Sequence, residues 1–356
     1  MTRKEEFSST ARRRLQAWCL LAAVLAWSMF AGAQTAKSHS LQVYFIDVDG
    51  GQSTLFVTPA GKSLLIDTGW AGNNGLDAGR IVAAAKDAGV SKIDYLLLTH
   101  YHADHLGGLP ELVAKIPVGT FIDHGPNSPT DPGNDKNYAA YQLLLTNGHY
   151  GHIVPKPGDA LPIPGIKAVV ISSNGEVLSH PLPEAGQPNT YCKDSETRPE
   201  DQTDNARSLG TLFTFGKTRI LDLGDLTWDK EMKLMCPDNR IGKVDILVVS
   251  HHGLFQSSSP ALLFAIAPRV AIMNNGAKKG GSTATFETLA KTPGLEALWQ
   301  LHFSNEAGMH NMAEEYIANP MGGNDAANYL KLTVNPKGGF SVFNARTGAS
   351  KDYPAR

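Results

Sequence analysis

The sequence predicts an α/β domain in which apolar strands lead directly into polar, metal-ligating residues. Strands are indicated at Leu41 to Asp47, Ser53 to Val57 and Ser63 to Asp67, and a helix is indicated from Ala78 to Gly89. Glycine and proline are plentiful, at 35 and 21 residues, as in α/β enzymes with many loops. Further apolar strands each end at a cluster of histidine or aspartate.

The first half opens as a β-meander. The Pro59-Ala60-Gly61 sequence predicts the turn between the second and third strands, and a glycine- and asparagine-rich loop, Gly69 to Gly75, comes before the helix. Gly89 is the residue type that caps a helix C-terminus. The short apolar segment Ile93 to Thr99 is typical of a strand buried inside a sandwich, and it delivers the chain to His100.

The second half has a longer irregular stretch before regular structure returns. A helix is expected at Tyr138 to Asn147, and residues 174–203 are rich in Pro, Glu, Asp and Asn. A long irregular segment inside a domain is usually functional or mobile, so a lid beside the site is one interpretation. The remaining elements expected are strands near Ile153 and at Ala168 to Ser172, Ser208 to Phe215, Arg219 to Leu223, Val244 to Ser250 and Arg269 to Met273, and a helix at Trp228 to Met235.

The N-terminus has the pattern of a secretory signal peptide. Three arginines, Arg12 to Arg14, precede an apolar run from Leu15 to Phe30, and Ala31-Gly32-Ala33 forms a small-residue cleavage site. The run is shorter than the roughly 20 residues of a spanning helix, which favours cleavage over a stable membrane anchor. We therefore expect a signal peptide at 1–33, a hydrolase-type domain at 40–356, and a periplasmic or secreted protein.

Charge and cysteine content restrict the partners. Removing residues 1–33 takes away five basic and two acidic side chains and lowers the formal net charge from −2 to −5. Nucleic acid remains a possible substrate that this charge does not favour, because binding a phosphate backbone normally needs a basic face. Cys192 and Cys236 either pair, as an oxidising compartment allows, or remain two buried thiols.

The strongest chemical signal is His100-Tyr101-His102-Ala103-Asp104-His105, which directly follows a buried strand. His100 and His102 are two residues apart, so in an extended segment both imidazoles point to one side and can bind one ion. Asp104 and His105 follow where the chain must turn and can serve a second ion. A chance histidine-rich loop is the alternative.

A second cluster argues against chance. Leu221-Asp222-Leu223-Gly224-Asp225 and Val249-Ser250-His251-His252-Gly253 both contain ligand-type residues after apolar strands. The carboxylate of Asp225 is suited to bridge two cations, and His251 can complete the second ion. Together the two clusters predict a metal site assembled from strand ends.

These residues also carry a family resemblance. HYHADHLGGL resembles the HxHxDH signature of the metallo-β-lactamase superfamily. The segments FIDVDGGQSTLF, LLIDTG, DNARSLGTLFTFGKTRILDLGD and VDILVVSHHG are similar, in the same order, to the hydrolase domain of ComEC/Rec2 competence proteins. The resemblance implies a four-layer αββα sandwich with the metals at one edge, and it covers roughly residues 41–276.

The resemblance also implies ligand assignments. His100 and His102 would bind one ion, Asp104, His105 and His251 the other, and Asp225 both. Asp104 would in addition accept or relay a proton during catalysis, with a metal-bound hydroxide as the nucleophile. The cofactors expected are one or two divalent ions, zinc or manganese, because imidazole and carboxylate ligands without thiolate do not distinguish the two metals.

Two departures from the family pattern are informative. Many superfamily enzymes have another histidine for the first ion before the Asp225 strand, where this chain reads Asp204-Asn205-Ala206-Arg207-Ser208. The first ion is then under-coordinated or bound by Asp204 or Asn205. The competence proteins have DVGQGDA where this chain has Gln52 in the acidic position, so substrate specificity does not transfer directly.

Several other residues are assigned weaker roles around the site. Asp67 is expected to orient a metal-bound histidine, and His252 to bind substrate or support a neighbouring ligand. Asp204, Asn205 and Ser208 complete the substrate-binding or supporting group. The remaining histidines have no partner at ligand spacing and are interpreted as ordinary: His124, His149, His152, His180, His302 and His310.

Three functions follow from these observations. An exported metal-dependent hydrolase acting on phosphodiester bonds, of a small molecule or of nucleic acid, agrees best with the ComEC-like segments. Hydrolysis of a carbon-based ester or amide, such as a lactone or β-lactam, uses the same chemistry, but the missing histidine argues against it. An inactive binding module is the third, and the six intact ligand positions argue against that.

Overall fold

The computed structural model describes residues 39–322 and 326–356, which pack as one compact unit from His39 to Arg356. The predicted signal peptide, residues 1–33, lies outside the described residues. Among the helices that are described, none has the length and apolar character needed to cross a membrane.

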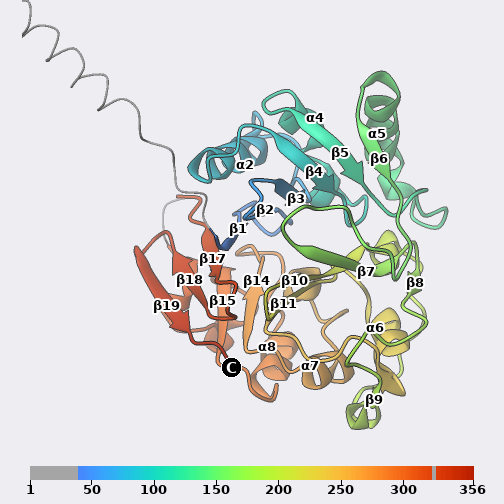
Figure 1. Cartoon of the computed structure of the whole chain (residues 1–356), viewed down its shortest axis with the longest axis vertical. Helices are drawn as coiled ribbons and strands as arrows, with labels where there is room; N and C mark the ends of the chain where they lie inside the picture. Colours follow the sequence, from blue (N-terminus) through green and yellow to red (C-terminus); the bar gives the residue numbers. More distant parts are fainter. Residues whose placement is uncertain (1–38, 323–325) are drawn as a thin grey trace, which may run out of the picture. The chain divides into compact units, whose positions relative to one another are not determined.

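The first sheet joins strands from the beginning and the end of the chain (Figure 1). In spatial order its strands are β19 (Ala349–Tyr353), β18 (Phe340–Asn344), β17 (Leu330–Val334), β1 (Leu41–Phe45), β2 (Thr54–Val57), β3 (Ser63–Ile66), β4 (Ile93–Leu97), β5 (Val118–Ile122) and β6 (Gly151–Ile153). Strands β19 to β3 pair antiparallel, and β3 to β6 pair parallel.

The second sheet is built from the middle of the chain. Its order is β16 (Ile317–Asn319), β15 (Ala297–His302), β14 (Val270–Met273), β13 (Ile246–Val248), β11 (Thr218–Asp222), β10 (Gly210–Phe215), β7 (Lys167–Ser173) and β8 (Glu176–Val177). Strands β11, β13, β14, β15 and β16 run parallel, so their C-terminal ends lie at one edge. A separate pair joins β9 (Gln187–Pro188) to β12 (Asp238–Asn239).

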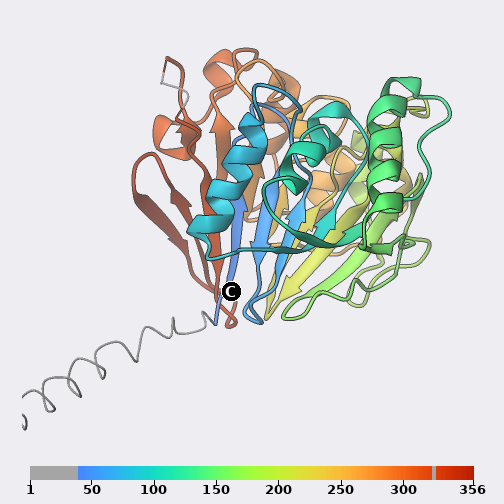
Figure 2. The same cartoon turned by 90° about the horizontal axis from the view of Figure 1, so that it is seen from above.

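Helices cover the outer face of each sheet, as Figure 2 shows. The first sheet carries α2 (Leu76–Asp87), α3 (Ala103–Leu106), α4 (Leu109–Val113) and α5 (Asp135–Asn147). The second carries α6 (Trp228–Met235), α7 (Pro260–Ile266) and α8 (Thr283–Ala290). Short 3₁₀ helices are η1 (Pro132–Asn134), η2 (Thr190–Asp194), η3 (Asp204–Arg207), η4 (Ser250–Gly253), η5 (Gly308–His310) and η6 (Glu314–Tyr316). The expected four-layer αββα arrangement is confirmed.

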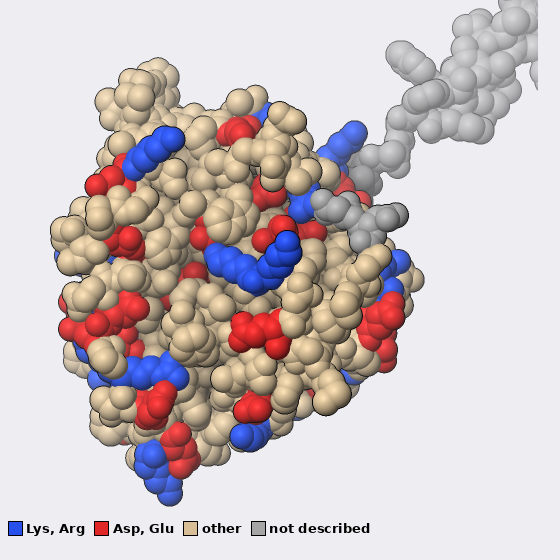
Figure 3. All heavy atoms as spheres, turned by 180° about the vertical axis from the view of Figure 1, so that it is seen from behind, with Lys and Arg blue, Asp and Glu red and all other residues tan. Residues whose placement is uncertain are grey.

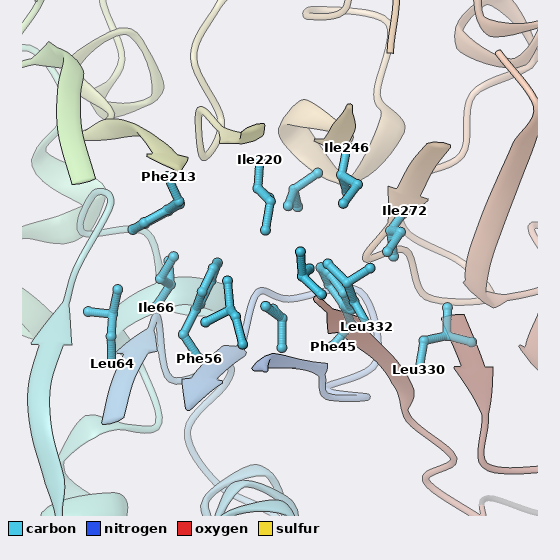
Figure 4. Close-up of a cluster of buried hydrophobic side chains, with 14 of the residues drawn as sticks. Phe45, Phe56, Leu64, Ile66, Phe213, Ile220, Ile246, Ile272, Leu330 and Leu332 are labelled. Atoms are coloured by element: carbon cyan, nitrogen blue, oxygen red, sulfur yellow. The ribbon is translucent and has the colours of Figure 1, made fainter. Parts of the chain in front are cut away.

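The main hydrophobic core lies between the two sheets (Figure 4). The rings of Phe56 from β2 and Phe213 from β10 meet with centroids 4.5 Å apart. Other side chains that face each other across this interface are Phe45, Leu64, Ile66, Ile220, Ile246, Ile272, Leu330 and Leu332. All are apolar because both inner sheet faces are closed to water, which stabilises the sandwich through buried apolar area.

The strands end earlier than the sequence suggests. The expected strands ran to Asp47, Asp67 and Thr99, but β1, β3 and β4 stop at Phe45, Ile66 and Leu97. At Asp67 the reason is a left-handed backbone, with φ at 58°, which ends the extended conformation. The polar residues after each strand are thereby freed to turn toward the site.

The irregular segment 174–203 is fixed at several points. Cys192 and Cys236 form a disulfide that ties η2 to the end of α6, which settles the question that the sequence left open. The indole nitrogen of Trp228 donates to the carbonyl of Glu196 at 2.9 Å. The segment therefore lies against the helices of the second sheet, and its end at Gln202 accepts a hydrogen bond from Thr130.

Candidate metal centre

The ligand-type residues meet at the C-terminal ends of strands from both sheets. His100 and His102 follow β4 of the first sheet, whereas Asp225 follows β11 and the His251-His252 pair follows β13 of the second. Ligand atoms of Asp104 and His105 from the first sheet lie within 4.8 Å of those of Asp225 and His252 from the second, so these strand ends share one edge of the sandwich. This is the edge where the sequence predicted the metals.

Two imidazole nitrogens face each other in the loop that follows β4. His100 Nε2 lies 3.0 Å from His102 Nδ1. The outward nitrogen of His102 lies 2.8 Å from a carboxylate oxygen of Asp131. Thr99 Oγ1 donates its proton to Asp67 at 2.6 Å, so it can only accept from His100 Nδ1, which is 3.1 Å away. These partners place the ring protons on His100 Nδ1 and His102 Nε2. The two facing nitrogens are therefore unprotonated, and their lone pairs can bind one cation.

A second facing pair spans the two sheets. His105 Nε2 lies 3.1 Å from His252 Nε2. The other nitrogen of His105 donates to Asp67 Oδ2 at 2.7 Å, and that of His252 donates to the carbonyl of Asn274 at 3.1 Å. Two lone pairs at this distance repel unless a proton or a metal cation lies between them, so the arrangement defines a second cation position.

Two buried carboxylates surround the second pair. Asp225 Oδ2 lies 3.3 Å from His105 Nε2, 3.4 Å from His252 Nε2 and 3.9 Å from His100 Nε2. Asp104 Oδ2 lies 3.0 Å from His252 and 3.2 Å from His105. One ligand atom from each of Asp104, His105, Asp225 and His252 falls within 4.8 Å of the others. This cluster can therefore enclose a single ion, with Asp225 also directed at His100.

The charges in the cluster attract cations. Burial alone would raise the pKa of Asp104 and Asp225, but the neighbouring imidazoles outweigh it and hold both values well below the ordinary range. Burial would lower the pKa of His105, yet Asp225 and Asp104 raise it well above its usual value. Burial and the adjacent imidazoles lower the pKa of His100. The carboxylates stay ionised, and a metal at the second position must displace a proton.

The donor set fits a divalent metal ion. It consists of buried imidazole nitrogens and carboxylate oxygens, and within the described residues both cysteines are joined in a disulfide. Such ligands suit zinc and manganese alike. The zinc-or-manganese alternative from the sequence stays open.

The structure brings His252, rather than His251, to the second pair. The sequence assigned His251 to that ion and gave His252 a supporting role. Both residues have left-handed backbones, with φ of 55° and 53°, so the chain turns through each of them and directs the two rings differently. His251 Nε2 lies 3.5 Å from Asp225 Oδ2, and burial lowers the pKa of His251 to about 4.

The predicted supporting residues lie around the cluster. Asp67 is fully buried and bonds both Thr99 and His105. Ser208 Oγ accepts from the backbone N–H of Asp225 at 3.2 Å. Asp204 Oδ2 accepts from the N–H of Tyr101 at 2.8 Å. The same oxygen lies 3.3 Å from His124 Nε2, so its partners lie outside the two facing imidazole pairs. Three of the histidines interpreted as ordinary have carboxylate partners outside the cluster, namely His124, His152 and His302.

Sequence reasoning missed Asp131, Asn274 as a histidine partner, and Lys279. The ammonium of Lys279 contacts Asp104 Oδ2 and lies 4.9 Å from the centre of the Trp70 ring. Asp131 and Lys279 stand in loops without any motif spacing, far from the clusters in sequence. The Lys278-Lys279 pair before two glycines was the only local signal, and it is equally typical of a solvated turn.

Comparison with known proteins supports this description. A sequence model of the metallo-beta-lactamase superfamily matches residues 47–187. The chain is 27% identical over 238 residues to Recombination protein 2 of Haemophilus influenzae, covering 66% of this chain and 24% of that protein. It is 30% identical over 192 residues to a UPF0173 metal-dependent hydrolase of Polynucleobacter asymbioticus, covering 50% and 61%.

Solved structures give weaker similarity. A metallo hydrolase from Ignicoccus hospitalis aligns with a TM-score of 0.38 and 13% identity, covering 70% of this chain and 90% of that one. The chain spans about a quarter of the length of Recombination protein 2 and 61% of the UPF0173 protein.

The family-model match and the buried histidine–aspartate cluster support the metallo-hydrolase class that the sequence predicted. The predicted resemblance to the metallo-β-lactamase superfamily, and within it to ComEC/Rec2-like proteins, is confirmed.

Proposed function

We propose that this protein is an exported hydrolase that uses two divalent cations to cleave phosphodiester bonds. The observation that carries the proposal is the two facing pairs of imidazole nitrogens, at 3.0 and 3.1 Å, on either side of Asp225. Paired cations, when bound, lower the pKa of water and neutralise the charge that develops on a phosphoryl group. Asp104 is the proposed proton acceptor at the second position.

A cation from the protein itself favours an anionic substrate. The ammonium of Lys279 lies beside Asp104 at the rim of the cluster and is about one-third exposed. It can donate to a non-bridging phosphate oxygen, and the ring of Trp70 beneath it restricts its motion. A neutral lactone or ester has no negative charge for this ammonium to bind, so Lys279 favours the phosphodiester over these neutral substrates.

The formal net charge of −2 supports a small phosphodiester over a nucleic-acid polymer. Figure 3 shows acidic and basic side chains interspersed over the face seen there, without a continuous basic band. A nucleic-acid groove normally presents basic residues along the backbone path. The relation to Recombination protein 2 keeps nucleic acid as the second candidate, to be decided by experiment.

Export is supported by the disulfide. Disulfides persist in oxidising compartments such as the periplasm and are rare in the cytosol, and Cys192 and Cys236 are bonded. The signal-peptide pattern of residues 1–33 points to the same compartment. Fractionation of the native host, with detection of a mature form that lacks these residues, tests this part of the proposal.

The test of function uses the mature protein loaded with zinc or with manganese. We expect hydrolysis of bis-p-nitrophenyl phosphate, lost in an Asp104→Ala, His105→Ala double variant. A series of cyclic dinucleotides and single-stranded DNA would then rank small against polymeric substrates. Turnover of lactones or β-lactams without any turnover of phosphodiesters would refute the phosphodiester assignment.

A second variant tests the role of Lys279. We expect Lys279→Met to lower kcat/KM for the phosphodiester at least about tenfold, because a charged donor to the transferred group is lost. Hydrolysis of a neutral ester should change much less. Lys278→Met, at an exposed neighbouring position, is the matched control and should leave both activities unchanged.

A further inference from the structure

The two cation positions are unequally supplied with ligands. The second position has Asp104, His105 and His252, with Asp225 beside them. The first has only the facing pair of His100 and His102, together with the more distant Asp225. Asp204, one of the residues expected to compensate, has one carboxylate oxygen bonded to the N–H of Tyr101.

His251 has an unprotonated ring nitrogen in this region. Ser257 Oγ donates its single proton to the carbonyl of Leu226 at 2.7 Å, so toward His251 Nδ1, 3.4 Å away, it can only accept. The proton of the imidazole is therefore on Nδ1, and Nε2 is unprotonated. That nitrogen is turned inward, 3.5 Å from Asp225 Oδ2.

The position of Asn205 shows that His251 Nε2 faces the Asp204–Arg207 turn. The side-chain amide of Asn205 donates to His251 Nε2 over 3.4 Å, a long hydrogen bond that a bound cation would replace. Asn205 belongs to the Asp204–Arg207 turn, which leads into β10 and supplies no imidazole. His251, which follows β13, thus contacts the Asp204–Arg207 turn, and that turn has no histidine.

The arrangement around Asp225 separates the two neighbouring histidines. Four imidazole nitrogens surround Asp225 Oδ2 at 3.3 to 3.9 Å, from His100, His105, His251 and His252. His252 belongs to the compact group with Asp104, His105 and Asp225, whose ligand atoms all lie within 4.8 Å of one another, and His251 does not belong to it. The second position is therefore already served by His252.

We propose that His251 is the third protein imidazole of the first cation position, so that one left-handed turn supplies a ligand to each ion. His100, His102 and His251 would bind the first ion, while Asp104, His105 and His252 bind the second, with Asp225 between them. This inference rests on the two-cation site of the proposed function and specifies how that site is completed.

Metal stoichiometry in single and double variants tests the assignment without any activity measurement. The full mature protein is equilibrated with zinc, freed of loose metal and analysed for bound ions, with circular dichroism to verify folding. We expect two ions in the native protein and one in each of His102→Ala, His251→Ala and His252→Ala. His149→Ala, at an exposed histidine, is the matched control and should keep two.

The double variants distinguish the two positions. If His251 and His102 serve the same ion, the His102→Ala, His251→Ala protein keeps one ion, and the His251→Ala, His252→Ala protein loses both. The opposite pattern would assign His251 to the second position and overturn the inference, as would two ions in His251→Ala or a single ion in the native protein. Cobalt in place of zinc provides a second readout, because removing His251 should abolish the visible absorption of one bound cobalt ion and leave that of the other unchanged.

Failure of the inference differs from failure of the proposed function. A protein with the expected stoichiometries that does not cleave phosphodiesters would uphold the ligand assignment and refute the function. Phosphodiester cleavage together with the opposite pattern of metal contents in the double variants would uphold the function and refute the ligand assignment.

Discussion

At the scale of single residues, Asp67 controls the hydrogen-bond direction of its neighbours. Its carboxylate accepts from the N–H and hydroxyl of Thr99 and from His105 Nδ1, and it is fully buried. Since an ionised carboxylate only accepts, His105 must keep its proton on the outward nitrogen, and Thr99 can only accept from His100. One acidic side chain thus fixes ligands for both cation positions.

We expect Asp67→Asn to weaken metal binding about 10- to 100-fold, the usual effect of losing a partner of a ligating histidine. Asparagine tolerates the left-handed backbone at this position, so the fold should be retained. Competition with a chelator measures the change in affinity. Asp94→Asn, which alters a carboxylate paired with Lys62, serves as control; equal loss in both variants would contradict the role of Asp67.

Glu231 is a second residue with a testable consequence. It lies fully buried in α6 and accepts from the backbone N–H groups of Ser258 and Ser259 at 2.7 Å. Burial outweighs these hydrogen bonds and raises the pKa of Glu231 to about 7. Between the ordinary value near 4.5 and about 7, the folded state therefore binds more protons than the unfolded state, and stability falls as pH rises.

The contribution lost from pH 4.5 to pH 8 is on the order of 3 kcal/mol, at about 1.4 kcal/mol per unit of pKa shift. Urea denaturation at several pH values should show this decline in the native protein and a shallower one in Glu231→Gln. Identical slopes for the two proteins would show that the carboxyl of Glu231 does not titrate in this range.

At the scale of elements, the disulfide determines where segment 174–203 lies. It closes a loop across 44 positions and holds η2 against α6 and α7. The cross-link lowers the conformational entropy of the unfolded chain, which stabilises the fold by about 4 kcal/mol in the loop-entropy model.

We expect a Cys192→Ser, Cys236→Ser variant to unfold at lower urea concentration, with a loss of that order. A reducing agent should lower the stability of the native protein similarly and leave the variant unaffected. A reductant effect of equal size in both would mean that the disulfide is not its cause.

The elements near the motifs could be predicted from sequence because each is an apolar run with a polar boundary. The strands that end at His100 and Asp225 were predicted within a few residues, as were α2, α5 and α6. Strands β15 to β19 were not predicted, and β17 to β19 return to the first sheet by pairing with β1, a contact between distant parts of the chain.

The site shows the same division between local and distant information. Motif spacing identified His100 to His105 because their geometry is local. The distinction between His251 and His252 depends on two left-handed residues in succession, which no propensity indicates. Asp131 and Lys279 reach the site only through tertiary folding, so no spacing could reveal them.

At the scale of the whole molecule, the interface between the sheets holds the two halves of the site together. Phe213 is fully buried and packs on Phe56 at its centre. We expect Phe213→Ala to lower the free energy of unfolding by about 3–5 kcal/mol, through lost burial and the cavity left behind. Leu143→Ala, at a side chain that is 61% exposed, should change it by less than about 0.5 kcal/mol. Comparable losses in the two variants would contradict this description of the core.

The position of Asp225 and His252 on one sheet, and of His100 to His105 on the other, has a consequence for preparing the protein. Neither sheet alone offers a complete ligand set, so a chain whose sheets have not joined can hold an ion only weakly. The molar ratio of tightly bound metal to polypeptide would then measure the fraction of correctly folded protein in a preparation. A low ratio would indicate misfolded chains even before a substrate is known.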